Sequence, residues 1–239
     1  MGNLALYTNN SSGNTAIGSI SMQGSYLGSD NTAVGMASLN QMTNGSFNVA
    51  IGGSSQANLI QGSGNTTVGD GAMLFYYFGN YLTAIGYNAL ANQHGSPGPS
   101  SNESYSVAVG YSALNNSSST IGYNTVVGSN AMYNNTTGYY NTASGAYALD
   151  QNSTGYANTA IGNDAMYQNS SGFINTVMGY YALYSNTSGY ENVASGYASL
   201  YENTTGSLNT AMGLEALLSN TTGSEKPGWD LAPIPMATG

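Results

Sequence analysis

Few residues in this chain could carry out chemistry. Its 239 residues include a single histidine, His94, a single basic residue, Lys226, and ten acids that lie one at a time along the sequence. His94 lies in the stretch NQHGSPGPS, which we expect to be a surface loop, and no pattern supports a Ser/His/Asp triad built on it. Asp70 stands in GDGA, where a carboxylate beside glycines could ligate calcium, but no column of acids repeats around it, so we expect a solvated turn. The sequence therefore predicts no enzyme, no metal site and no cofactor.

The charge balance narrows the range of partners. The formal net charge is −9, and only 5% of the residues are charged. Binding to nucleic acid depends on clustered Lys and Arg, so we expect no nucleic-acid partner. No apolar run reaches the about 18 to 20 residues of a membrane span, and the start MGNLALYTNN lacks the basic and long apolar segments of a secretory signal. We therefore expect no membrane insertion, and the absence of cysteine excludes disulfides and thiolate metal sites.

Two groups of residues could recognise or carry sugars. The stretch MLFYYF places four aromatic residues where a polar turn is expected, so they could stack on sugars or contact another chain if exposed, and local overpacking is the alternative. These candidates are Phe75, Tyr76, Tyr77 and Phe78. N-x-[ST] sequons recur at one turn, where Asn-Thr-Thr-Gly is good turn chemistry and where glycans would line one edge. The candidate glycosylation sites are Asn135, Asn152, Asn169, Asn186, Asn203 and Asn220.

An internal repeat must position all of these residues. One glycine recurs at intervals of 17 residues, with single intervals of 24 and 18 near the middle of the chain. The idealised unit is N-T-A-[IV]-G-x-x-A-L-Y-x-N-T-T-G-x-x, almost complete from Asn175 to Glu191. Such a repeat indicates a stack of like units over residues 1–223, with an irregular insertion at about 91–104 and a proline-rich extended tail at 224–239. The recurring glycines are Gly18, Gly35, Gly52, Gly69, Gly86, Gly110, Gly128, Gly145, Gly162, Gly179, Gly196 and Gly213.

Each unit is typical of one coil of a β-solenoid. It is too short for a helical hairpin, and its interior carries Thr, Val, Ile and Gly rather than helix formers. We expect a first strand at N-T-A-I-G, a second strand centred on A-L-Y, and a turn at N-T-T-G whose glycine takes a positive φ. The predicted fold class is all-β, a parallel β-solenoid (β-roll) of about 12–13 coils. Stacking in register would place Asn over Asn and align five tyrosines in one ladder, Tyr7, Tyr133, Tyr167, Tyr184 and Tyr201.

The alternation of the first strand allows two orientations. Val107 and Val109 point to one face and Ala108 to the other, as do their equivalents in each coil. Because Val and Ile gain more from burial than Ala, we expect the valines inside and an uncharged alanine stripe outside, where another chain can approach. The reversed orientation stays open, and it would display a Thr ladder of the kind that suits an ice-binding β-solenoid. The candidate assembly interface on the stripe comprises Ala108, Ala143, Ala160 and Ala211.

The repeat units also resemble a known family. SVAVGYSAL at 106–114 and NTAIGNDAM at 158–166 are similar to the coil of the head domains of trimeric autotransporter adhesins, in which three chains pack side by side as β-rolls. The N-T-A-x-G-x-x-A-L-Y-x-N-T-T-G units look like repeats of phage tail-fibre-like and bacterial surface proteins, although the period is longer than the usual adhesin coil. The resemblance covers residues 2–223. It implies left-handed coils, a homotrimer, and an extracellular, cell-surface or virion-associated location.

The ends of the chain suggest a second mode of assembly. Met1 and Gly2 align with the last two residues of the first strand, so we expect an open coil that can stack on another molecule. The tail carries Trp229, Leu231 and Ile234 as apolar anchors that could bridge to the next subunit. The sequence therefore predicts a non-enzymatic structural subunit of an extracellular fibre or filament with a repetitive adhesive or surface-presenting face. Its expected partners are copies of itself, as a homotrimer or a head-to-tail filament, and surface glycans. The alternatives are an ice-binding solenoid and a carbohydrate-binding tail-fibre segment.

Overall fold

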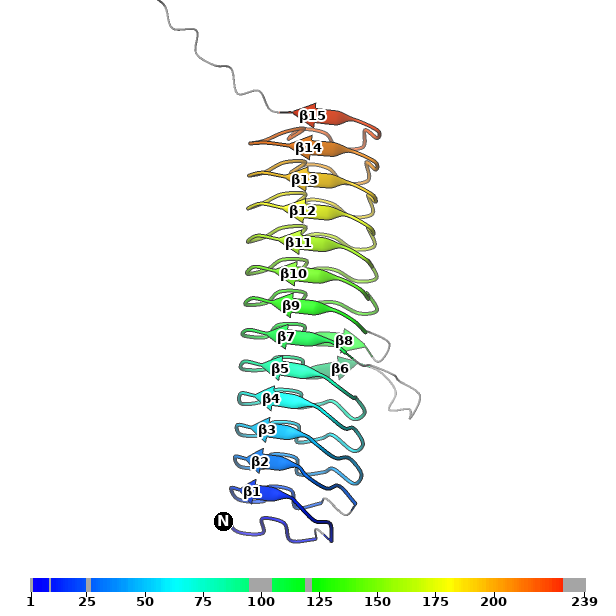
Figure 1. Cartoon of the computed structure of the whole chain (residues 1–239). Helices are drawn as coiled ribbons and strands as arrows, with labels where there is room; N and C mark the ends of the chain where they lie inside the picture. The colour runs from blue at the N-terminus through cyan, green and yellow to red at the C-terminus, as the bar shows by residue number, and fades with distance from the viewer. Residues whose placement is uncertain (1, 9, 25–26, 95–104, 119–121, 230–239) are drawn as a thin grey trace, which may run out of the picture.

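Short strands stack along one axis into a rod (Figure 1). The computed structural model describes residues 2–8, 10–24, 27–94, 105–118 and 122–229. Within these residues there is no helix, and thirteen strands form one sheet in which every neighbouring pair is parallel. The strands are β1 (Thr15–Ile17), β2 (Thr32–Val34), β3 (Val49–Ile51), β4 (Thr66–Val68), β5 (Thr83–Ile85), β6 (Asn92–His94), β7 (Val107–Val109), β8 (Asn116–Ser118), β9 (Thr125–Val127), β10 (Thr142–Ser144), β11 (Thr159–Ile161), β12 (Thr176–Met178), β13 (Val193–Ser195), β14 (Thr210–Met212) and β15 (Pro227–Trp229).

The register of the sheet follows the sequence repeat. Thr159 pairs with Thr176 and Ala160 with Val177, so each residue lies beside its equivalent one repeat later. β5 pairs directly with β7, and β7 with β9, which means that the two longer intervals are absorbed outside this sheet. The predicted fold class, an all-β parallel β-solenoid with a 17-residue repeat, is confirmed.

The second strand predicted for each coil is wrong. In the regular coils the Ala-Leu-Tyr segment is a turn, because the residues two and four positions after the glycine take positive φ, as in Asp164 (55°) and Met166 (52°). These left-handed residues still join the coils, since the Met166 N–H donates to the Ala182 carbonyl (3.0 Å), but they break strand geometry. Among the described residues, a second strand occurs only beside the insertion, where β6 pairs with β8. Residues 95–104 of the predicted insertion lie outside the described part of the chain.

Two glycines per coil permit close stacking, each for its own reason. Gly162 has a φ of 135°, and a Cβ there would lie 2.5 Å from the carbonyl oxygen of Gly179 in the next coil. Only glycine tolerates both conditions. The glycine of the Asn-Thr-Thr-Gly turn does not take the positive φ that we predicted, as Gly155 illustrates. It is required by space alone, because a Cβ on Gly155 would lie 2.4 Å from the Gly172 carbonyl oxygen.

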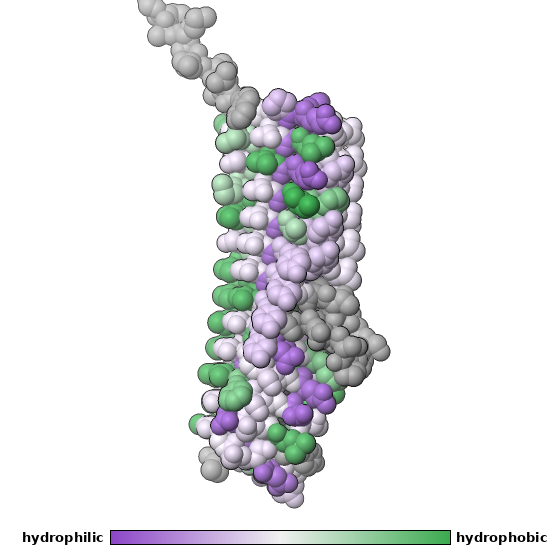
Figure 2. Space-filling view, turned by 45° about the vertical axis from the view of Figure 1, so that its right-hand side comes forward, coloured by the Kyte–Doolittle hydropathy of each residue, from purple (hydrophilic) through white to green (hydrophobic). Residues whose placement is uncertain are grey.

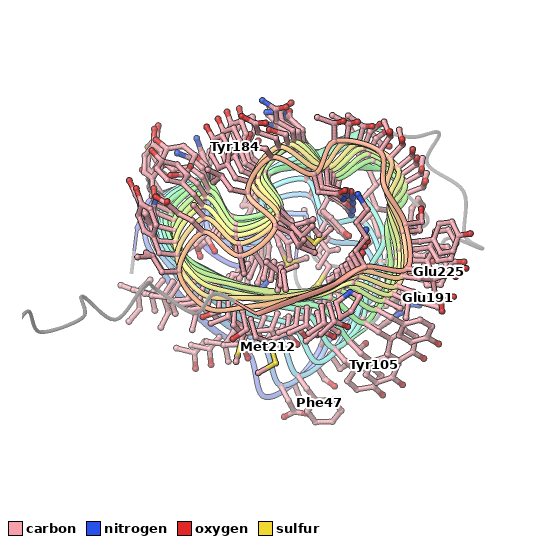
Figure 3. The ribbon with its side chains drawn as sticks, turned by 90° about the horizontal axis from the view of Figure 1, so that it is seen from above. Phe47, Tyr105, Tyr184, Glu191, Met212 and Glu225 are labelled. Carbon is pink, nitrogen blue, oxygen red and sulfur yellow. The ribbon has the colours of Figure 1, made fainter. Side chains whose placement is uncertain are left out.

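The buried and exposed faces of the strands are the reverse of the prediction. Ala108 is fully buried, whereas Val107 and Val109 lie on the outer face and are only partly buried. The interior is narrow, and a buried Leu or Met from the opposite wall, such as Leu114, already fills it. The middle of the strand therefore holds a small residue, Ala in most rungs and Val at Val126 and Val177, because a side chain larger than Val would overfill this space. In the view along the axis, Met212 at the end of β14 points away from the interior (Figure 3).

Two columns of asparagine line the interior and join successive coils. In the first column, which precedes the strand, Asn175 Nδ2 donates to Asn158 Oδ1 (3.0 Å) and to the Gly189 carbonyl (3.0 Å). In the second column, Asn186 Nδ2 donates to Asn169 Oδ1 (2.8 Å) and to the same Gly189 carbonyl (3.0 Å). The predicted stacking of Asn over Asn is confirmed, and it satisfies polar groups that the narrow interior would otherwise leave unpaired.

The solenoid continues past the predicted boundary at residue 223. β15 pairs with β14 in the common register, with Gly228 beside Ala211. The Lys226 N–H donates to Asn209 Oδ1 (3.0 Å), as the equivalent N–H groups do in the inner coils. Residues 224–229 therefore form a further rung, while residues 230–239 of the predicted tail lie outside the described residues.

Candidate functional surfaces

The sheet displays two columns of side chains on its flat outer side, which we call the outer strand face. The first column holds the residue that begins each strand, which is Thr in nine of the first twelve rungs and Val in three. The second column holds the residue that ends each strand, mostly Ile, Val or Met, and 41% of Ile161 and 49% of Met178 is exposed. No charged residue occurs in either column from β1 to β14. Figure 2 shows the apolar column in green along the left edge, beside the paler Thr column.

A continuous band of stacked rings, which we call the aromatic strip, lies beside the outer strand face (Figure 2). Neighbouring centroids within its two stacks are 4.9–5.4 Å apart, with interplanar angles of 4–28°. Tyr139 and Tyr140 join the stacks edge to face at 5.3 Å, so the strip shifts sideways by one column without a break. The strip comprises Tyr81, Tyr105, Tyr123 and Tyr140 in the lower stack, and Tyr139, Tyr156, Phe173 and Tyr190 in the upper stack.

The tyrosine ladder predicted from the sequence is present over three coils. Tyr167, Tyr184 and Tyr201 stack with centroids 5.2 Å apart. Asp150 occupies the position below Tyr167 in this column and separates it from Tyr133, so the ladder does not run the length of the rod. The aromatic strip was not predicted, although its tyrosines recur in the sequence at two fixed positions before the strand.

Asp150 is the most perturbed acid among the described residues. Burial raises the pKa of its carboxyl to about 6, the hydrogen bond from Gln151 Nε2 opposes this shift, and the negative charge of Asp164 in the next coil adds to it. Burial also raises the pKa of Asp164. The negatively charged form of both carboxyls is therefore disfavoured in the folded protein. In the described residues, no three His, Cys, Asp or Glu side chains come together as a group that could hold a metal ion.

The aromatic residues predicted at 75–78 do not form an exposed cluster. Tyr76 is completely buried, Tyr77 and Phe78 are half-buried, and only Phe75 is exposed. Tyr76 lies seven residues after Gly69, the position that Asn135 and its equivalents occupy in later coils, so its ring fills the interior. The overpacking alternative describes this segment better than a sugar-stacking surface.

The predicted glycosylation sites are wrong. Asn169 is fully buried, its Nδ2 donates to Asn152 Oδ1 (2.7 Å) and to the Gly172 carbonyl (3.0 Å), and its Oδ1 accepts from Asn186. A glycan on this nitrogen would occupy the space of the coil interior and remove a ladder donor. The same inward position is shared by all six candidates, Asn135, Asn152, Asn169, Asn186, Asn203 and Asn220.

The predicted assembly residues on the alanine stripe are also wrong, because each of them is fully buried. These residues are Ala108, Ala143, Ala160 and Ala211. Gly2 lies against Gly18, where an added Cβ would be 2.2 Å from the Gly18 carbonyl carbon, so it joins the glycine column as the alignment predicted. Trp229 is the last residue of β15, and its side chain is not among the parts that the structure describes. Met1, Leu231 and Ile234 lie outside the described residues.

The remaining candidates for chemistry are scattered. His94 ends β6, Asp70 is exposed at a turn, and Lys226 is exposed directly before β15. Over the ranges that the structure describes, there is no helix of the length and apolarity needed to span a membrane. Comparison with protein-family models, with curated proteins and with solved structures finds no match for this chain.

Proposed function

We propose that this chain is a structural, non-enzymatic subunit of an extracellular fibre. The observation that carries the proposal is the unbroken register, in which the same inner and outer columns pass through all thirteen rungs of the sheet. At about 4.8 Å per rung, these rungs span about 60 Å. Directional hydrogen bonds between coils, from backbone groups and from both asparagine columns, resist bending and stretching of such a rod. The repeated outer surface then presents the same contacts at every level.

Side-by-side association through the outer strand face is the mode of assembly that we propose. An apolar column that only Ser144 and Ser195 interrupt, bordered by uncharged threonines, is unusual on the surface of an isolated soluble protein. Strands of three residues cover about 10 Å across, so thirteen rungs offer about 600 Å² to a partner. Two such faces together reach about 1,200 Å², the lower end of specific interfaces. This face replaces the alanine stripe as the candidate contact between copies.

The test of assembly is the mass of the protein in solution. We expect light scattering to show masses above the 24.5 kDa of one chain, rising with concentration. Ile161→Lys places a charge in the middle of the apolar column and should return the protein to one chain. Thr205→Lys, at an exposed turn away from this face, is the matched control and should assemble like the wild type. A wild type of single-chain mass at every concentration, or an Ile161→Lys variant that still assembles, contradicts the proposal.

The aromatic strip is the surface that we propose for contact with glycans or other surfaces. Its ring faces are largely covered by the neighbouring rings of the stack, so a sugar would meet the ring edges and the phenol hydroxyls. These exposed groups recur once per coil, which favours an extended chain of sugars over a single small one. A glycan array is the direct test: binding should weaken when Tyr105 and Tyr123 become Ala, and no binding to any glycan contradicts this part of the proposal.

Ice binding is a second candidate function, favoured by the outward direction of the Thr column. This orientation places threonine hydroxyl and methyl groups in a flat, regular array along the rod. Such an array can order water, and the neighbouring Ile and Val column keeps the face flat. We expect thermal hysteresis or ice shaping if this is the function, with loss of both when Thr159→Tyr roughens the face. Wild-type protein that leaves ice growth unchanged excludes this candidate.

A further inference from the structure

The aromatic strip brings together groups that can react with one another. In its lower stack the rings of Tyr81 and Tyr105 lie 5.3 Å apart at an angle of 11°, and those of Tyr105 and Tyr123 lie 5.4 Å apart at 15°. More than half of each of these three side chains is exposed. Their strands are adjacent rungs of one parallel sheet, so the stacking is imposed by the backbone register. The phenol edges of successive coils are therefore both close together and accessible to an oxidant.

Phenols in this arrangement have a defined oxidative chemistry. A one-electron oxidant removes an electron and a proton from each of two tyrosines, and the two phenoxyl radicals form one carbon–carbon bond between positions ortho to their hydroxyls. Each ring then loses its ortho hydrogen to a proton transfer and regains a hydroxyl. With hydrogen peroxide as the terminal oxidant, two tyrosines and one peroxide give one dityrosine and two waters. The step needs a peroxidase-type oxidant and no other co-reactant.

We propose that the stacked tyrosine pairs are modification sites at which a peroxide-dependent one-electron oxidant joins successive coils through dityrosine bonds. The chain has 21 tyrosines and no cysteine, so its composition allows abundant phenol coupling and no disulfides. A bond between Tyr81 and Tyr105 would tie β5 to β7 across the insertion, where the sequence between the two rungs is longest. Each further bond would tie one more coil to its neighbour. The inference is independent of side-by-side assembly, because both partners belong to one chain.

The upper stack contains its own control. Tyr190 stacks on Phe173 at 4.9 Å, and Phe173 has no hydroxyl and cannot form a phenoxyl radical. Ser207 occupies the same position in the next coil. Tyr190 is 38% exposed, close to the 40% of Tyr139, yet Tyr139 has a tyrosine partner in Tyr156 at 5.2 Å. If accessibility alone selects the reacting residues, Tyr190 and Tyr139 should react equally. If stacking on another tyrosine selects them, Tyr139 should react and Tyr190 should not.

The experiment is to treat dilute full-length protein with a haem peroxidase and hydrogen peroxide. We expect dityrosine fluorescence in a product that still migrates as one chain, and peptide mapping should find pairs that have lost two hydrogen atoms. The lower stack and Tyr139–Tyr156 should be among these pairs, as should other stacked tyrosines such as Tyr87–Tyr111 (5.6 Å), whereas Tyr190 should be absent from them. Phe173→Tyr completes the upper stack without changing its shape, so it should bring Tyr190 into a cross-link. Tyr105→Phe should abolish both pairs that involve residue 105 and retain Tyr123–Tyr140.

Three results would overturn the proposal. The first is the absence of cross-links within one chain, including the case in which dityrosine forms only between chains. The second is cross-linking of Tyr190 in the wild type at the yield of Tyr139, which would mean that exposure and not stacking selects the sites. The third is a Phe173→Tyr variant in which Tyr190 still does not react. Circular dichroism of both variants before oxidation verifies that the β-structure is retained.

Discussion

Replacing one asparagine of the second asparagine column should strongly lower the free energy of unfolding of the rod. Asn169→Ala removes donations to Asn152 Oδ1 and to the Gly172 carbonyl, and it removes the acceptor of Asn186 Nδ2. Gly172 keeps the donor Asn158, and Asn186 keeps Gly189, so the one group left without its ladder donor is Asn152 Oδ1. Three hydrogen bonds at about 0.5–1.5 kcal/mol each, one of them ending in an unsatisfied buried oxygen, give a loss of about 2–4 kcal/mol.

Urea unfolding followed by circular dichroism measures this loss, and amide hydrogen exchange shows where it occurs. Exchange should accelerate most in the coils next to residue 169, because each coil of a solenoid contacts only its neighbours. Gln168→Ala is the matched control, since Gln168 is exposed and one residue away, and it should change stability by less than about 0.5 kcal/mol. A loss below about 1 kcal/mol for Asn169→Ala, or equal losses for both variants, would show that the amide column contributes little to stability.

Further substitutions probe three other features, the buried polar contact of Gln56, the buried Asp150 and a residue at positive φ. Gln56→Leu should stabilise the protein by about 1–2 kcal/mol in urea unfolding, because Gln56 Oε1 is buried without a partner, while Thr67 Oγ1 keeps Ser55 Oγ and the Val49 carbonyl keeps Thr67 Oγ1. Thr67→Ala should destabilise it instead, because both Gln56 Nε2 and the buried Ser55 hydroxyl lose a partner. The raised pKa of Asp150 means that the folded state favours its protonated form, so stability should be highest below about pH 4 and fall as pH rises through 6. Asp150→Asn should remove that fall and add about 1–2 kcal/mol at pH 8 once solvent screening is allowed for. Glu191→Gly, at a φ of 53°, should raise the melting temperature, and Glu202→Gly, which is not at a positive φ, should lower it.

The sequence predicts the coil count and the register because one backbone angle recurs in every coil. The glycine that ends the strand has φ of 118–144° throughout, a region that other residues rarely adopt, and it also meets the next coil too closely for a side chain. Because every coil requires glycine at this position, the glycine recurs at a fixed interval that can be seen in the sequence. The asparagine columns are visible for the same reason, since each amide needs a like amide one coil away.

Which face of the strand is buried could not be predicted from the sequence repeat in the same way. A period of two is symmetric between the faces, and the gain from burial favours Val and Ile inside when each residue is considered alone. The volume of the coil decides instead, because Leu149 or its equivalent enters from the opposite wall and leaves room for no more than an Ala such as Ala143 or a Val such as Val177. That volume depends on the turn geometry, which is set by non-glycine residues at positive φ such as Tyr147 (58°) and is not visible in a hydrophobic pattern.

The interior column seven residues after the glycine divides the rod into two kinds of core. In the lower coils the column holds Met42, Leu59 and Tyr76, all completely buried, and in the upper coils it holds Asn135 and its equivalents. Apolar contacts are not directional, so the lower coils can adapt to irregular turns, and the 24-residue interval follows directly after them. Amide ladders are directional, because each donor must meet one acceptor in the next coil. The amide ladders therefore hold the regular spacing of the upper coils, in which Tyr139, Tyr156, Phe173 and Tyr190 stack. The stack from Tyr81 to Tyr123 lies over coils without this ladder, so the register of the sheet alone holds its rings together.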